Sequence, residues 1–481
     1  MGKDNRRNNP ALVHYTLFNG KSAYVSVKAF ENDLRKLAQS SGKSVIDAYT
    51  MTSNFLCSKP SKRLADILEK INNPGPVMLK SSIDSDPENY IALAVGADTP
   101  TNEDFPKVLE NFMHSVVHRH QRLSSKGWLS TSVDVAIQSV ISSMFDSGLL
   151  SNHDKIGIMT PIRPSILNLP EIYGLSPVYI NEDELDEEDP TYDHSILSEH
   201  GIKLMIIENP NSFTGELLDD PSLFVKLMEN NLDITFVVVS TLAPFITKDH
   251  KDFGILPSDR VVSIFSMSEY LGTPGLNTTL VTMAADNHTL DRKVSVDCNS
   301  EYCPPVTGFM SRVRQDAESR GDRVSTIQRL ITSIGAQCNL EDNSYIDTAR
   351  SLLFARNEIF REALHGVPRP VKDSHSCFVS TFNALELAFE LTNDRSQQAR
   401  LKQSGISGSI EFSRVIAQKY GIMIAPGPVF GGSIWDFRIV LANVDDDELN
   451  KIAEAVEETI RGWTVTTRVK TRRRQRNRIL V

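Results

Sequence analysis

A series of short, almost wholly apolar stretches constrains the fold of this chain more than any other feature. They read DKIGIMTP, IKLMIIENP, DITFVVVST, RVVSIFSMS and NTTLVTMAAD, all between residues 154 and 286. Strands that are apolar on both sides are typical of a mainly parallel sheet covered by helices. A helical pattern precedes the series, with apolar residues at 133, 137, 140, 141 and 144. The sequence therefore predicts an α/β fold.

The pattern changes after about residue 310. Residues 319–337 and 344–364 have long helical patterns, followed by strand-like SCFVSTF, a helical stretch at 410–420, and the strands GIMIAP and DFRIVLA. A last helix, opened by three aspartates, has one apolar stripe. We expect an N-terminal arm and part of a small domain in 1–85, a large domain in 86–315, a smaller α/β C-terminal domain in 316–466 and a basic tail in 467–481.

Composition and charge narrow the class of protein. Apolar residues make up 40% of the chain and charged residues 23%, as in ordinary soluble proteins. No apolar run is long enough to span a bilayer, and the first residues do not resemble a secretion signal, so we expect a cytoplasmic protein. The net charge of −10 makes nucleic acid an unlikely partner. We expect the acidic segment 181–193 to be a solvated loop and the basic tail from Arg468 to be a disordered terminus. Contact of this tail with RNA or an anionic membrane is the alternative.

Histidines and cysteines do not form a recognisable metal motif. His114, His118 and His120 lack the glutamate of an H-E-x-x-H site, and the cysteines are scattered. We therefore expect no metal. Cys377 and His375 would share one face of a strand, which leaves a cysteine–histidine pair open as a weak alternative.

Three motifs, in order, resemble one enzyme family. They are ENPNSFTG at 208–215, SMSEYLGTPGLN at 266–277 and APGPVFGGSIWDFRIVLAN at 425–443. Together with the order of strands and helices, over about residues 28–463, they resemble the fold-type-I aminotransferases, which use pyridoxal phosphate. The resemblance is to the aspartate aminotransferase superfamily, and within it to the aspartate aminotransferase/aspartate 4-decarboxylase branch. It implies the same fold.

The resemblance also implies that the groups that hold the cofactor have been replaced. The lysine that forms the Schiff base falls on Glu269, and a carboxylate cannot condense with an aldehyde. The arginine that pairs with the phosphate falls on Asn277, and the aspartate that pairs with the pyridinium nitrogen falls on Ser240. We therefore expect no bound cofactor.

Further positions of the family pattern are altered as well. The tyrosine near the cofactor falls on Ala243 and the asparagine of the first motif on Ser212. The phosphate cradle falls on Ser132 and Asp134, where the carboxylate repels an anion. The aromatic residue that stacks on the ring falls on Arg163.

One family residue is retained. Arg438 matches the arginine that binds the substrate carboxylate, although an ordinary strand arginine paired with an acidic neighbour is an equal alternative. We name Arg438 and Arg163 as candidate substrate-binding residues.

Two hypotheses about function follow. The first is a pseudoenzyme that forms no aldimine and binds or regulates through an amino-acid or keto-acid carboxylate, as a homodimer or with an active paralogue. The alternative is an active aminotransferase-like or decarboxylase-like enzyme acting on an amino acid. It would bind pyridoxal phosphate noncovalently or use Glu269 as an acid or base. A lysine elsewhere, such as Lys248, would be needed to form an aldimine.

Overall fold

The computed structural model describes residues 12–16, 22–50, 107–116, 125–181, 197, 200–218, 231, 233–246, 260–272, 277–284, 309–341, 344–364, 376–392, 396, 398 and 408–478. These residues form two compact units. The larger unit takes its described residues from 60–212 and 216–351, and the smaller from 1–59, 213–215 and 352–481. The domain boundaries given above stay a prediction.

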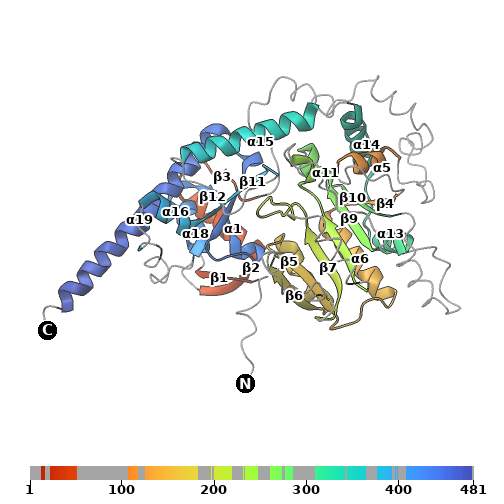
Figure 1. Ribbon diagram of the computed structural model, residues 1–481, viewed down its shortest axis with the longest axis horizontal. Coiled ribbons are helices and arrows are strands. Elements are labelled where there is room, and N and C mark those ends of the chain that lie inside the picture. The colour runs from red at the N-terminus through yellow and green to blue at the C-terminus, as the bar shows by residue number, and fades with distance from the viewer. Residues whose placement is uncertain are drawn as a thin grey trace. The chain divides into compact units, whose positions relative to one another are not determined.

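The larger unit is built on a seven-stranded sheet with the strand order β4-β10-β9-β8-β7-β5-β6 (Figure 1). The pairs β5–β6, β5–β7, β7–β8 and β8–β9 are parallel, and β10 is antiparallel to β9 and β4. The predicted mainly parallel sheet is therefore confirmed. Its strands are β4 (Ser125–Ser130), β5 (Lys155–Thr160), β6 (Ser176–Asn181), β7 (Ile202–Glu208), β8 (Thr235–Val239), β9 (Val261–Ser266) and β10 (Thr279–Ala284).

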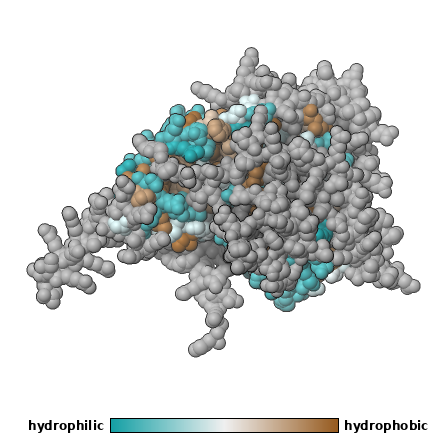
Figure 2. Space-filling model, viewed as in Figure 1, coloured by the Kyte–Doolittle hydropathy of each residue, from teal (hydrophilic) through white to brown (hydrophobic). Residues whose placement is uncertain are grey.

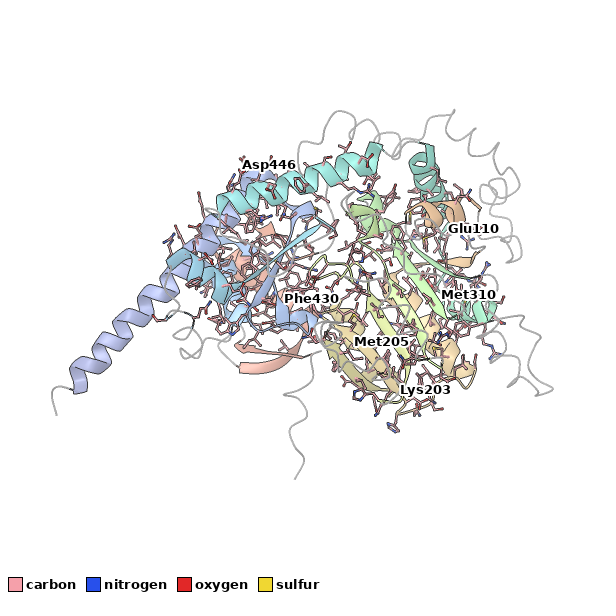
Figure 3. All side chains as sticks on the ribbon, viewed as in Figure 1. Glu110, Lys203, Met205, Met310, Phe430 and Asp446 are labelled. Carbon is pink, nitrogen blue, oxygen red and sulfur yellow. The ribbon has the colours of Figure 1, made fainter. Side chains whose placement is uncertain are left out.

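Burial explains the apolar sequences of the central strands. All residues of β8 and β9 are buried, and β7 has one exposed residue, Lys203, near its start (Figure 3). Met205 on β7 packs with Phe236 and Val238 on β8 in one apolar cluster. Complete burial of a side chain of this size contributes roughly 1.5–3 kcal/mol. Packing of side chains from neighbouring parallel strands therefore contributes to the stability of the sheet.

Helix α6 (Val133–Asp146) follows β4 directly and contacts β4, β9 and β10. Ser132 caps it, because its Oγ accepts a hydrogen bond from the backbone N of Val135 at 3.1 Å. Ile137, Val140 and Ile141 are buried, which confirms the predicted apolar face.

The helices after residue 309 differ in part from the prediction. α13 (Phe309–Ser319) ends before a turn in which Gly321 has φ +86, and α14 (Thr326–Glu341) begins only at Thr326. The predicted helix at 319–337 is therefore wrong over its first residues, because a glycine in the left-handed region ends a helix. α15 (Ser344–Ala363) is confirmed.

The smaller unit contains a three-stranded antiparallel sheet in the order β11-β14-β13. A second, two-stranded sheet pairs β12 with β3 in parallel, and β1 pairs with β2 antiparallel. The predicted strand GIMIAP is thus two short strands in different sheets. The strands are β1 (Leu12–Thr16), β2 (Ser22–Ser26), β3 (Ile46–Asp47), β11 (Val379–Asn383), β12 (Ile422–Met423), β13 (Ala425–Pro426) and β14 (Asp436–Val440).

Helices α1 (Val27–Ser40) and α18 (Gly408–Tyr420) pack together in the smaller unit. Phe30 and Leu34 of α1 share an apolar cluster with Tyr49, Phe213 and Phe430. The described part of this unit also contains the helices α16 (Ala384–Thr392), α19 (Asp446–Arg478) and the second part of α15. The smaller α/β unit is as predicted.

The last helix is longer than expected. Asp445 caps α19, because its Oδ1 accepts from the backbone N of Glu448 at 2.8 Å while the Glu448 carboxylate accepts from the backbone N of Asp445 at 3.0 Å. The helix continues through the basic residues to Arg478. The prediction of a disordered terminus is therefore wrong as far as residue 478. No glycine or proline follows Gly462, and arginine, lysine and glutamine favour helix.

Figure 2 shows hydrophilic and hydrophobic residues interspersed on the visible face. Among the described residues, the most exposed large apolar side chains are Ile172 on α8 (Leu169–Tyr173), Phe354 on α15 and Ile434, which precedes β14. Among the helices that the structure describes, none combines the length and the apolar character needed to cross a membrane.

Candidate functional site

Polar side chains follow the carboxyl ends of four parallel strands at one edge of the larger sheet. Arg163 lies three residues after β5, Glu208 ends β7, Ser240 follows β8, and Glu269 lies three residues after β9. Ligands of open α/β sheets bind at this edge. Glu269 belongs to a single helical turn, α11 (Met267–Leu271), which ends at Gly272 with φ +59. The motif SMSEYLGTPGLN thus begins at the last residue of a strand and continues into a short helix.

Glu208 forms the centre of this polar cluster. Its side chain is 0% exposed. Its Oε1 accepts from Arg163 Nε at 3.2 Å, and its Oε2 accepts from the backbone N of Arg163 at 3.1 Å. Oε2 also accepts from the backbone N of Ser212 at 3.3 Å and from the Ser212 hydroxyl. A buried carboxylate needs such donors, so Glu208 fixes the positions of both residues.

Arg163 connects Glu208 to Glu269. Its Nη2 donates to Thr241 Oγ1 at 3.3 Å and lies 3.9 Å from Glu269 Oε1. Burial alone would lower the pKa of Arg163, but the charges of Glu208, Glu269 and Asp134 raise it above its ordinary value. Arg163 is therefore a cation held among carboxylates. Arg163 and Glu269 were both predicted as site residues, and the structure places them beside each other.

Ser132 is the N-cap of α6, just after β4, and Asp134 lies in the first turn of the helix. The Ser165 hydroxyl donates to Asp134 Oδ1 at 2.6 Å, and the Ser132 hydroxyl caps the helix. The free N–H groups at a helix start attract anions, but here a capping serine uses one of them and an aspartate occupies the first turn. The start of α6 is consequently a poor anion site.

Asp322, which follows α13, anchors the same turn. Its side chain accepts from Ser130 Oγ at 2.7 Å, from the backbone N of Thr131 at 2.7 Å and from Thr131 Oγ1 at 2.6 Å. Asp322 is 6% exposed. These bonds set the end of β4 and therefore the place where Ser132 and Asp134 begin α6.

The remaining altered positions are mostly buried. Ser212 and Ser240 are buried, and the backbone N of Ser240 donates to Ile264 O at 2.8 Å. Ala243 lies in a buried single turn (Ala243–Phe245) after β8. Asn277 is exposed, with φ 49 in the left-handed region, which asparagine tolerates better than arginine does.

Arg438 lies in the smaller unit, on β14. It is 1% exposed, its guanidinium stacks 4.3 Å from the ring centroid of Phe430, and its Nη2 donates to the backbone O of Tyr49 at 3.0 Å. Strand β14 pairs Arg438 with Thr381 on β11 and Ala425 on β13. Arg438 is thus a buried cation on a sheet face, with an aromatic wall beside it.

The remaining candidates, a reactive cysteine and a metal site, find no support among the residues that the structure describes. Burial raises the pKa of the Cys377 thiol to about 11, so the thiol is protonated at neutral pH and is a weak nucleophile. Its proposed partner His375 lies outside the described residues, as do His118, His120 and Lys248. No group of three or more histidine, cysteine, aspartate or glutamate side chains that the structure places could hold a metal ion.

Sequence reasoning missed Glu208 and Asp322. Glu208 ends an otherwise apolar strand, IKLMIIE, and a charge at such a position needs a buried partner. That signal indicates a buried donor nearby, and the structure shows that the donor is Arg163, which follows the neighbouring strand. Asp322 gave no comparable signal, because its partners lie 191 and 192 residues away in the chain.

Comparisons with known proteins bear on the fold. No protein-family model matches the chain. The chain is 24% identical over 355 residues to a bifunctional aspartate aminotransferase and L-aspartate beta-decarboxylase of a Pseudomonas species. The match covers 67% of this chain and 64% of that relative's length.

The matches to solved structures cover a larger share of this chain than the match to the Pseudomonas relative does. An aspartate aminotransferase double mutant of Thermus thermophilus matches with a TM-score of 0.60 and 12% identity, over 95% of this chain and 100% of that chain. The substrate-bound BacF protein of Bacillus subtilis matches with a TM-score of 0.62 and 12% identity, over 90% of this chain and 95% of that chain. The chain has the fold of the fold-type-I aminotransferases. In this fold, the aminotransferase-like large unit contains the Glu208–Arg163–Glu269 cluster and the smaller unit contains Arg438.

Proposed function

We propose that this chain is an aminotransferase-like pseudoenzyme, which forms no aldimine with pyridoxal phosphate and binds an amino or keto acid through its carboxylate. The observation that supports the proposal is the position of Arg163, a cation held by buried Glu208 and facing Glu269 and Asp134. These charged side chains interact with one another at the carboxyl edge of the sheet.

The chemistry of Glu269 does not suit the covalent step. In the family that the chain resembles, a lysine amine attacks the aldehyde of the cofactor, whereas a carboxylate forms no imine. Glu269 also lies 3.9 Å from Arg163. On this proposal it serves as one of several counterions for Arg163.

The groups around Glu269 do not suit the phosphate either. Asp134 and Glu269 would each repel it, at about 3 kcal/mol per pair of unit charges 5 Å apart for an effective permittivity near 20. Arg163 could offset part of this cost, but its guanidinium already donates to Glu208 Oε1 and to Thr241 Oγ1. Ser240 offers a neutral hydroxyl where an acidic group would be needed to hold a charged ring nitrogen. The residues present therefore do not fit pyridoxal phosphate.

The proposed ligand is a small carboxylate that binds at Arg438. A guanidinium is planar and binds a carboxylate with two parallel hydrogen bonds, and stacking on the ring of Phe430 orients it. The Pseudomonas relative is described as acting on aspartate, so L-aspartate is the first ligand to test. We further propose that the chain assembles as a homodimer or with an active paralogue, which light scattering would test.

A spectroscopic titration tests the cofactor half of the proposal. Purified protein is titrated with pyridoxal phosphate, and we expect only the spectrum of the free aldehyde. The variant Glu269→Lys supplies the missing amine; we expect it to form at most a weak adduct, since Asp134 and Ser240 are unchanged. A saturable aldimine band in the wild-type protein would favour the active enzyme instead.

Calorimetry tests the carboxylate half. L-Aspartate and succinate are titrated into the wild-type protein, Arg438→Lys and Arg438→Ala, each first shown to be folded by circular dichroism. A charged hydrogen-bonded contact contributes roughly 1.5–3 kcal/mol, so Arg438→Ala should bind about tenfold to a hundredfold more weakly. The affinity of Arg438→Lys should lie between those of the wild type and Arg438→Ala, because lysine keeps the charge but lacks the paired donors. Equal binding by all three proteins would make Arg438 a structural residue.

A further inference from the structure

We infer that Thr381, on the strand beside Arg438, is a second binding residue for the carboxylate and donates its hydroxyl to it. The inference rests on the proposed binding of a carboxylate at Arg438 and adds a residue to that site.

Strand pairing places the two side chains together. Thr381 on β11 and Arg438 on β14 are direct partners in an antiparallel pair. Side chains of directly opposed residues lie on the same face of a sheet, with Cβ atoms about 4.5–5.5 Å apart. The partners two residues to either side on this face are Val379 with Val440, and Asn383 with Asp436. Thr381 and Arg438 thus form the boundary between an apolar and a polar half of the face.

The Thr381 hydroxyl is buried without a partner. The residue is 1% exposed, and its Oγ1 has no hydrogen-bond partner among the described residues. Buried polar groups are nearly always hydrogen-bonded, and one that is not needs an explanation. A ligand oxygen beside Arg438 would supply the missing acceptor.

A second buried hydroxyl belongs to the same neighbourhood. Tyr49 is 5% exposed, and in the described part of the chain its Oη also has no hydrogen-bond partner. Its backbone O accepts from Arg438, and its ring packs in the same cluster as Phe430, on which Arg438 stacks. The region therefore combines a guanidinium with hydroxyl donors.

This set of donors defines the chemical class of the ligand. A carboxylate has two oxygens and about four acceptor sites, so it can accept from the guanidinium and from Thr381 together. A protonated amine offers only donors and would be repelled by Arg438. A carboxamide has one acceptor oxygen and no charge, so it can replace only part of these bonds. We therefore expect selectivity for carboxylates over the matching amides. Because Arg438 is 1% exposed, the ligand reaches it only after neighbouring side chains move.

The test compares hydroxyl-deleting and hydroxyl-retaining variants by calorimetry with succinate and L-aspartate. Thr381→Val removes the hydroxyl at nearly constant volume, and Thr381→Ser keeps it. Thr332→Val is the matched control: Thr332 is 0% exposed, and its hydroxyl also has no partner within the described residues, but it lies on α14 in the larger unit.

We expect Thr381→Val to bind succinate about tenfold more weakly than the wild type, and Thr381→Ser and Thr332→Val to bind within about twofold of it. Thr381→Val binding as tightly as the wild type would overturn the inference while leaving the carboxylate site intact. If the wild type binds neither ligand after long incubation, the proposed function fails and this inference fails with it. If Thr381→Val does not fold, Thr381→Ser is the deciding variant. Binding of succinate about tenfold weaker than that of the wild type would then count against the role of the hydroxyl, because serine keeps the hydroxyl.

Discussion

Replacing Glu208 with glutamine should destabilise the protein more than any comparable change on the surface of the same strand. Glu208 accepts four hydrogen bonds, two from Arg163 and two from Ser212, with its side chain 0% exposed. Glutamine keeps one acceptor oxygen but introduces an NH₂ group that would face the same donors. The change also removes the charge that balances Arg163.

The expected magnitude follows from the remaining charges. Removing one partner of a fully buried ion pair costs about 3–5 kcal/mol. Arg163 is 18% exposed and still has Glu269 at 3.9 Å, so part of its charge stays compensated. We therefore expect Glu208→Gln to lower the free energy of unfolding by about 2–3 kcal/mol.

Equilibrium urea unfolding, followed by circular dichroism, measures this cost. The matched control is Lys203→Met on the same strand, where Lys203 Nζ lies 2.9 Å from Asp154 Oδ2 and the lysine side chain is 47% exposed. A surface pair of this kind contributes roughly 0–1 kcal/mol. Adding Arg163→Met to Glu208→Gln should recover part of the loss, because it removes the uncompensated charge. If Glu208→Gln costs no more than Lys203→Met, the buried network does not hold the site as we describe.

The same unfolding assay checks two more changes, and a thiol assay checks a third. Gly408→Ala should cost about 3 kcal/mol or more, because an added Cβ would lie 1.8 Å from Ile434 O at φ +57. Gly201→Ala, at φ +66 with nothing within 4 Å, should cost only about 1 kcal/mol and serves as its control. Asp322→Asn should cost about 2 kcal/mol, since a buried carboxylate that accepts three hydrogen bonds loses its charge. Cys377→Ser should leave the number of thiols that react rapidly at neutral pH unchanged. Burial raises the pKa of Cys377 to about 11, so its thiolate forms only as pH rises toward that value.

Much of the fold follows from the sequence because long-range burial leaves a local pattern. Strands such as TFVVV and VVSIFS are buried on both faces, and their apolar sequences report it directly. The amphipathic pattern of α6 is equally local. The split of GIMIAP into two strands was missed, because pairing with distant strands decides it. The turn at Gly321 was missed although its signal is local, since a glycine in the left-handed region ends a helix.

The site could be predicted only in part. The residues that follow the strands were named, and the structure brings Arg163, Glu269 and Asp134 together as one electrostatic group. Their partner Glu208 was not named, because a charge at a strand end shows a need for a partner but not which residue meets it. The state of Arg438, buried against Phe430, likewise depends on side-chain packing that no local pattern encodes.

The central claim is that no lysine of this chain forms an aldimine in the place that Glu269 occupies. Borohydride reduction in the presence of pyridoxal phosphate, followed by intact-mass and peptide mass spectrometry, tests it most directly. An active aminotransferase serves as the positive control, because reduction fixes its cofactor to one lysine. We predict no stoichiometric adduct on this chain, only scattered low-level modification of surface lysines. One phosphopyridoxyl group per chain on a single lysine would contradict the account.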